Sequence, residues 1–88
     1  MPEIAVDGLC ALLADGIRQF TQEIAANEAK AAALRALIDR MTGRAGDGDA
    51  TVEQLRAQLA EIEQQIESAQ ASIRALEEER TFIGCPPA

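Results

Sequence analysis

Apolar residues recur at alternating steps of three and four along two segments of this chain, and this repeat limits the possible folds more than any other feature. It runs from Cys10 to Met41 and again from Val52 to Leu76. A seven-residue repeat sustained over several heptads is typical of helices that wind around each other in a left-handed coiled coil. The predicted seam consists of Cys10, Leu13, Ile17, Phe20, Ile24, Asn27, Ala31, Leu34, Ile38 and Met41 in the first segment, and Val52, Leu55, Leu59, Ile62, Ile66, Ala69, Ile73 and Leu76 in the second.

The stretch MTGRAGDGDAT separates the two segments and predicts a turn over residues 43–50. Gly43 is expected just past the end of the first helix, in the left-handed conformation that glycine tolerates. Thr51 and Gln54 match a capping box, which predicts that the second helix starts there. A short connection of this kind favours two neighbouring antiparallel helices.

The predicted fold class is therefore all-α, an antiparallel two-helix hairpin that associates into a four-helix bundle. The single domain spans residues 1–88, with helices at about 3–42 and 51–81 and a tail at 82–88. The residue numbers of two facing seam residues are expected to add up to 93, so that Met41 faces Val52 and Ile17 faces Leu76. The rod is expected to be about 50–60 Å long at a rise of about 1.5 Å per residue. The first sixteen residues are predicted to continue the first helix from about Pro2, with a short separate helix folded over the open end as the alternative.

The two cysteines of the chain, Cys10 and Cys85, meet at the same end of this predicted rod. The register places Cys10 opposite Ile83, and the chain after Gly84 is free to turn toward it. A disulfide there closes a long loop and stabilises the hairpin by about 4 kcal/mol in the chain-entropy model. Two alternatives stay open, namely a buried free thiol at Cys10 and a bond between chains through Cys85.

Acidic residues gather at the predicted turn, where Asp47, Asp49 and Glu53 lie within seven positions. Carboxylate oxygens bind divalent cations, but acidic residues also favour helix N-termini and turns, and no metal site is predicted. A long antiparallel coiled coil with an acidic tip resembles, in shape, the Gre and DksA transcription factors, which enter the secondary channel of RNA polymerase. The chain departs from that family because only GCPPA follows the coil, without a second globular domain or a zinc finger.

The outward positions of the first helix carry more small and apolar residues than a two-helix seam requires. Small residues let another helix approach closely, and exposed leucines favour burial in a partner, so a homodimer through this helix is expected. Asn27 in the seam either fixes the register or reaches water. The predicted association face comprises Leu9, Leu12, Ala25, Ala26, Ala29, Ala32, Ala33, Ala36 and Leu37.

Composition excludes several classes of function. The net charge is −7, which disfavours nucleic acid and anionic membrane surfaces as partners. The chain has no histidine and no glycine-rich phosphate loop, so neither an enzyme, a small-molecule substrate nor a cofactor is expected. The acidic run Glu77-Glu78-Glu79 near a helix C-terminus is explained either by a solvated face or by a basic partner.

The expected function is a small protein–protein interaction module, such as an adaptor, co-chaperone or assembly factor. A repeating subunit of a larger assembly and an acidic-tip regulator of RNA polymerase are the alternatives. The expected location is the cytoplasm, because the N-terminus lacks the basic start of a secretory signal, with leaderless export left open.

Overall fold

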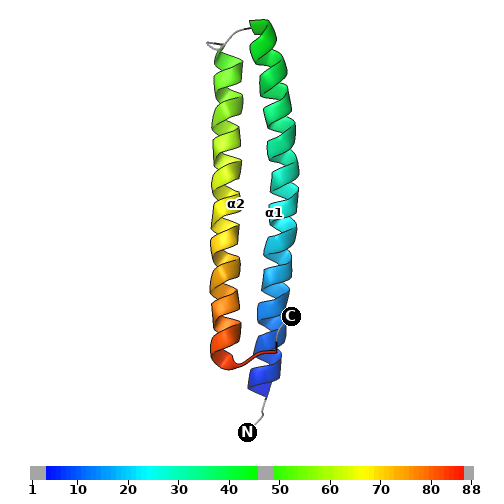
Figure 1. Ribbon diagram of the computed structural model, residues 1–88, viewed down its shortest axis with the longest axis vertical. Coiled ribbons are helices and arrows are strands. Elements are labelled where there is room, and N and C mark those ends of the chain that lie inside the picture. Colours follow the sequence, from blue (N-terminus) through cyan, green and yellow to red (C-terminus); the bar gives the residue numbers. More distant parts are fainter. Residues whose placement is uncertain (1–3, 46–48, 87–88) are drawn as a thin grey trace.

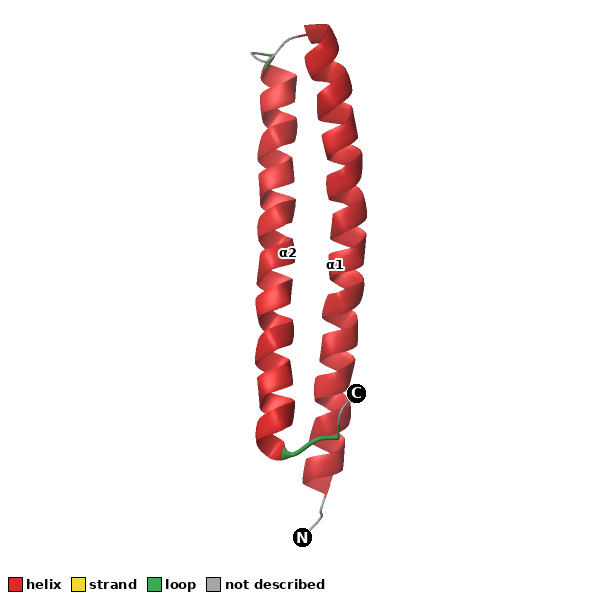
Figure 2. Ribbon diagram, viewed as in Figure 1, coloured by secondary structure: helices red, strands yellow, loops and turns green. Residues whose placement is uncertain are grey.

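A computed structural model describes residues 4–45 and 49–86. Most of these residues form two long helices, α1 (Ile4–Ala45) and α2 (Ala50–Ile83). The helices run antiparallel and side by side as a hairpin (Figure 1). No strand occurs in these residues (Figure 2). The predicted all-α hairpin is confirmed. The molecule measures 66 × 18 × 14 Å, longer than expected because α1 alone has 42 residues.

The core of the rod is the seam that the seven-residue repeat predicts. The four buried hydrophobic residues among the described positions, Ala31, Ile38, Val52 and Ala69, all belong to it. The other predicted seam residues are half-buried, since two helices alone cover each other on one side only. The seam therefore holds the hairpin together but leaves much of its own surface in contact with water.

Two contacts fit the expected register. A Cβ atom added to Gly16 would come within 3.1 Å of the Leu76 Cδ1 atom, next to the predicted pair of Ile17 and Leu76. Farther along the rod, the Arg35 guanidinium donates a hydrogen bond of 2.8 Å to Glu63 across the two helices. Both residues directly follow seam residues, which is where charged pairs flank a coiled coil.

The helix boundaries near the turn differ from the prediction. Gly43 lies inside α1, which continues to Ala45, so its expected role as the left-handed residue after the helix is wrong. The capping box is also wrong, because α2 begins at Ala50 and its N-cap is Asp49. Residues 46–48, which include Asp47, lie outside the described part of the chain. Propensity was misleading here because a single glycine costs a helix only about 1 kcal/mol, whereas an aspartate side chain caps as well as a threonine does.

The first segment of the chain is one continuous helix from Ile4 through Gly8 and Gly16, as predicted, rather than a short helix folded over the end. At the other end of the chain, α2 runs two residues beyond its predicted limit and stops at Ile83. Gly84 then adopts the left-handed conformation with φ of 82°. Its N–H donates to the Thr81 carbonyl at 3.2 Å, and the Cys85 N–H donates to the Arg80 carbonyl at 2.8 Å. This turn sends the tail back across the rod toward α1 (Figure 2).

Candidate functional site

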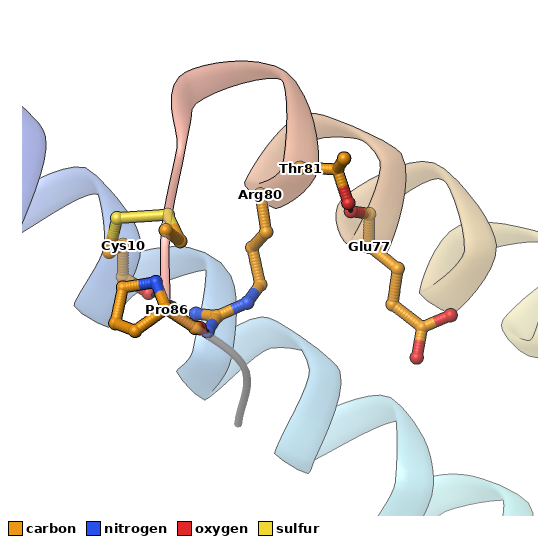
Figure 3. The surroundings of a disulfide bond; sticks show 6 residues. Cys10, Glu77, Arg80, Thr81 and Pro86 are labelled. Carbon is orange, nitrogen blue, oxygen red and sulfur yellow. Dashed lines mark hydrogen bonds between the residues drawn. A yellow bond between two sulfur atoms is a disulfide. The ribbon is translucent and has the colours of Figure 1, made fainter.

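The open end of the rod, opposite the turn, is closed by a disulfide bond between Cys10 and Cys85 (Figure 3). The two Cα atoms lie 5.6 Å apart, a separation that a disulfide spans without moving the backbone. The bond joins positions 75 residues apart in the sequence. Of the pairings that the sequence left open, the structure contains the one within a single chain.

Arg80 adds a second link at this end. Its guanidinium donates one hydrogen bond to the Cys10 carbonyl at 2.9 Å and another to the Pro86 carbonyl at 2.5 Å. The side chain is half-buried and lies over α1 beside the disulfide (Figure 3). It therefore ties α2, α1 and the tail together.

Sequence reasoning missed Arg80, although a signal for it exists. The seven-residue repeat of the second segment, continued past Leu76, reaches position 80 and then Ile83. An arginine in a seam position can bury its aliphatic stem and direct its guanidinium to polar atoms at the edge. An arginine in the seam position nearest the open end therefore suggests that its guanidinium can reach backbone carbonyls there.

The two cysteines bond to each other, so neither is free. The charges beside the bond are mixed, because the Arg80 guanidinium donates to the Cys10 carbonyl while Glu77, Glu78 and Glu79 precede it on α2. The disulfide covalently links the N-terminal part of α1 to the segment that follows α2.

The outer face of α1 exposes apolar residues in two stretches, at Leu9 and Leu12 and again over residues 25–37, and polar residues separate the two. Leu12 exposes 67% of its surface, Leu9 46% and Leu37 41%. The six alanines predicted for this face, at positions 25, 26, 29, 32, 33 and 36, are all exposed as well. All nine residues of the predicted association face thus lie on the surface of the hairpin, available to a further helix.

The outer surface of α2 differs, since its exposed residues are mostly glutamate, glutamine, arginine and serine. It also exposes several alanines and one large hydrophobic residue, Phe82 in its last turn, which exposes 85% of its surface. Sequence reasoning placed Phe82 in the tail and gave it no role. An aromatic residue one position before seam residue Ile83 was the available signal, because that position lies outside the seam.

The described acidic residues of the tip serve the helix start. The Asp49 carboxylate accepts hydrogen bonds from the backbone N–H groups of Thr51 at 2.8 Å and Val52 at 3.3 Å. Glu53 forms an ion pair of 3.1 Å with Arg56, one turn along α2. In the parts of the chain that the structure describes, no group of three or more histidine, cysteine or acidic residues is arranged to hold a metal ion.

Asn27 lies in the seam and is half-buried, between Ile24 and the buried Ala31. Partial exposure leaves its amide within reach of water, so its predicted role in fixing the register stays a prediction. Neither α1 nor α2, over the residues described, contains a stretch apolar and long enough to cross a membrane.

Comparisons of the chain with protein-family models, with curated proteins and with solved structures find no match.

Proposed function

We propose that this protein is a small, non-enzymatic interaction module that works through the outer face of α1. The observation that supports this proposal is the asymmetry of the hairpin. Three leucines and six alanines are exposed on α1, whereas the outer surface of α2 is mostly polar. Large exposed apolar side chains that share one helix mark interaction sites more often than solvated surfaces.

The incomplete burial of the seam points in the same direction. Only four of the described hydrophobic residues are buried, so a lone hairpin shields little apolar surface from water. Two hairpins that pack through the outer faces of their α1 helices form a four-helix bundle, in which the apolar side chains exposed on each α1 are covered. The alanines allow the close approach of helices that such packing needs. In this proposal the protein is a homodimer, and an adaptor, co-chaperone or assembly role follows from the surfaces that stay free.

The location of the protein is part of the proposal. The cytoplasm was expected from the sequence, but disulfides persist mainly in oxidising compartments. The bond between Cys10 and Cys85 therefore favours an oxidising compartment over the cytoplasm. Alkylating free thiols in intact cells before lysis tests this proposal, since a cytoplasmic protein would take up the alkylating reagent at both cysteines.

The deciding experiment is the molar mass in solution, measured by light scattering over a range of protein concentration. A stable dimer of hairpins is expected, with and without reductant, because α1 forms the interface. A monomer at all concentrations would contradict self-association. Mass that keeps growing with concentration would instead favour a repeating subunit of a larger assembly.

A matched pair of double variants locates the interface. Ala29→Gln with Ala36→Gln places two bulky polar side chains on the outermost positions of α1 and is expected to give a monomer. Ala57→Gln with Ala71→Gln makes the same change on the outermost positions of α2 and is expected to leave the dimer intact. All four alanines are exposed in the hairpin, so neither change disturbs its own core. Equal effects of the two double variants would contradict an interface on α1.

A further inference from the structure

Three of the four large hydrophobic residues that the described chain exposes lie at its open end. Phe82 is 85% exposed, Leu12 67% and Leu9 46%, whereas the fourth, Leu37, lies toward the turn. Leu9 and Leu12 belong to the first turns of α1, and Phe82 belongs to the last turn of α2. The antiparallel arrangement brings these two chain ends together (Figure 1), and the disulfide holds them there.

These side chains lie on one flank of the rod. In an antiparallel pair, residues that directly follow a seam residue share one flank, and residues that directly precede one share the other. The contact between Arg35 and Glu63, each directly after a seam residue, shows the first flank. Leu9, Leu12 and Phe82 directly precede Cys10, Leu13 and Ile83, and so lie on the second flank.

In the half of the rod next to the open end, the charged residues on this second flank are all acidic. The positions that precede seam residues between 9 and 26 and between 65 and 82 include Glu23 and Glu79 but no lysine or arginine. On the first flank, by contrast, the same half carries Arg18 and Arg74. A surface that combines exposed hydrophobic side chains with carboxylates alone complements a ligand that is both apolar and cationic.

The surface next to Phe82 is slightly hollowed. A shallow, open depression near the end of α2 is lined by Ala75, Leu76, Glu78, Glu79 and Phe82. Its apolar floor and acidic edge match the two faces of an amphipathic helix, which lays its apolar face against a hydrophobic surface of its partner. A lysine or arginine beside Phe82 would also gain a cation–π contact. A second copy of this chain suits the surface less well, because Glu79 would then lie close to its own symmetry mate.

We infer that this open-end surface, made of Leu9, Leu12, Ala75 and Phe82 with the carboxylates of Glu78 and Glu79, docks a cationic amphipathic helix of a protein partner. Phe82 is the central anchor and the carboxylates align the basic residues of the ligand. The inference rests on the proposed function in so far as both take the protein to act by binding a helix. The two surfaces overlap at Leu9 and Leu12 on α1, whereas Phe82, Glu78 and Glu79 lie on α2, which the proposed homodimer interface leaves free.

The test uses the oxidised protein of residues 1–88 and two fluorescently labelled peptides. One is a helical peptide of about 18 residues, or five turns, that carries leucine on one face and lysine on the other. The second peptide has glutamate in place of every lysine. Fluorescence anisotropy is expected to show saturable binding of the lysine peptide, weakened by added salt, and no binding of the glutamate peptide. Equal binding of both peptides would overturn the inference.

Variants then place the site. Phe82→Ser is expected to weaken binding of the lysine peptide at least about tenfold, as loss of an aromatic anchor does. Glu79→Gln is expected to weaken it less and to reduce its salt dependence. Gln58→Ser is the matched control, because Gln58 is exposed on α2 and directly precedes seam residue Leu59, so it lies on the same flank but toward the turn. It is expected to leave affinity within about twofold, which is less than the loss of a single exposed contact.

Equal losses of affinity in Phe82→Ser and Gln58→Ser would refute the assignment of the surface. The molar mass of each variant, measured on the same samples, separates this result from the fate of the proposed homodimer. A monomer that binds the lysine peptide through Phe82 would refute self-association and support the docking surface. A dimer in which Phe82→Ser leaves the affinity for the lysine peptide unchanged would support self-association and refute the docking surface.

Discussion

At the scale of single residues, one buried side-chain polar atom among the described residues lacks a hydrogen bond. The Thr42 hydroxyl is buried near the turn, and it has no hydrogen-bond partner among the described residues. A buried hydroxyl without a partner loses its contacts with water and gains nothing in return. Thr21 provides the contrast, since its exposed hydroxyl donates to the Ile17 carbonyl at 2.8 Å.

Thr42→Val is therefore expected to stabilise the protein by about 1 kcal/mol, because it removes the hydroxyl and keeps the branched shape. Thr21→Val is the matched control in the same helix and is expected to leave the stability unchanged or slightly lower. Urea unfolding followed by circular dichroism measures both. A destabilised Thr42→Val variant would show that the hydroxyl has a partner, such as an ordered water.

Glycine positions in α1 offer a second residue-scale prediction. Gly8→Ala is expected to stabilise the helix by about 0.5–1 kcal/mol, because a Cβ atom there meets no other atom within 4 Å. Gly16→Ala is expected to gain less, since its Cβ would lie 3.1 Å from Leu76 and that side chain must move. The difference between the two free energies of unfolding is the measurement. A larger gain at Gly16 would mean that the two helices are not in close contact there.

At the scale of the helices, the start of α2 depends on one side chain. Asp49 accepts hydrogen bonds from the Thr51 and Val52 backbone N–H groups, which no helical carbonyl can reach. Its negative charge also lies at the positive end of the helix dipole.

Asp49→Ala is expected to cost about 1 kcal/mol of stability, within the usual range for loss of an N-cap, whereas Asp49→Asn keeps most of it. Thr51→Ala is the control that separates the observed cap from the one that the sequence favoured, and it is expected to cost less than half as much. A larger loss in Thr51→Ala, measured by urea unfolding, would restore Thr51 as the cap.

The repeat of apolar residues predicted the elements well because it reflects one physical demand, the burial of a stripe on each helix. It identified the seam that contains Ala31, Ile38 and Val52, and it gave the register that brings Gly16 against Leu76. It could not decide where the helices end, since Gly43 and Asp49 act through local hydrogen bonds that have no period. It also left the disulfide open, because the path of the tail depends on the left-handed turn at Gly84.

At the scale of the whole molecule, the chain ends are tied together at three points. The disulfide joins α1 to the tail, Arg80 donates to carbonyls of Cys10 and Pro86, and Gly84 directs the tail across the rod. A two-helix rod would otherwise fray first at this open end, where few residues are buried. The disulfide and the Arg80 hydrogen bonds therefore lie where the seam between the helices is least buried.

Loss of the disulfide is expected to lower the free energy of unfolding by up to about 4 kcal/mol, because the bond closes a loop between positions 75 residues apart and so restricts the unfolded chain. Urea unfolding of the wild type with and without reductant, at one fixed protein concentration, measures this change. The double variant Cys10→Ser with Cys85→Ser should have the same free energy of unfolding as the reduced wild type. Reductant should leave its unfolding midpoint unchanged. Because the bond lies within one chain, a denaturing gel without reductant should show a single-chain band. An unfolding midpoint of the wild type that does not respond to reductant would mean that the disulfide contributes nothing to the stability of the hairpin.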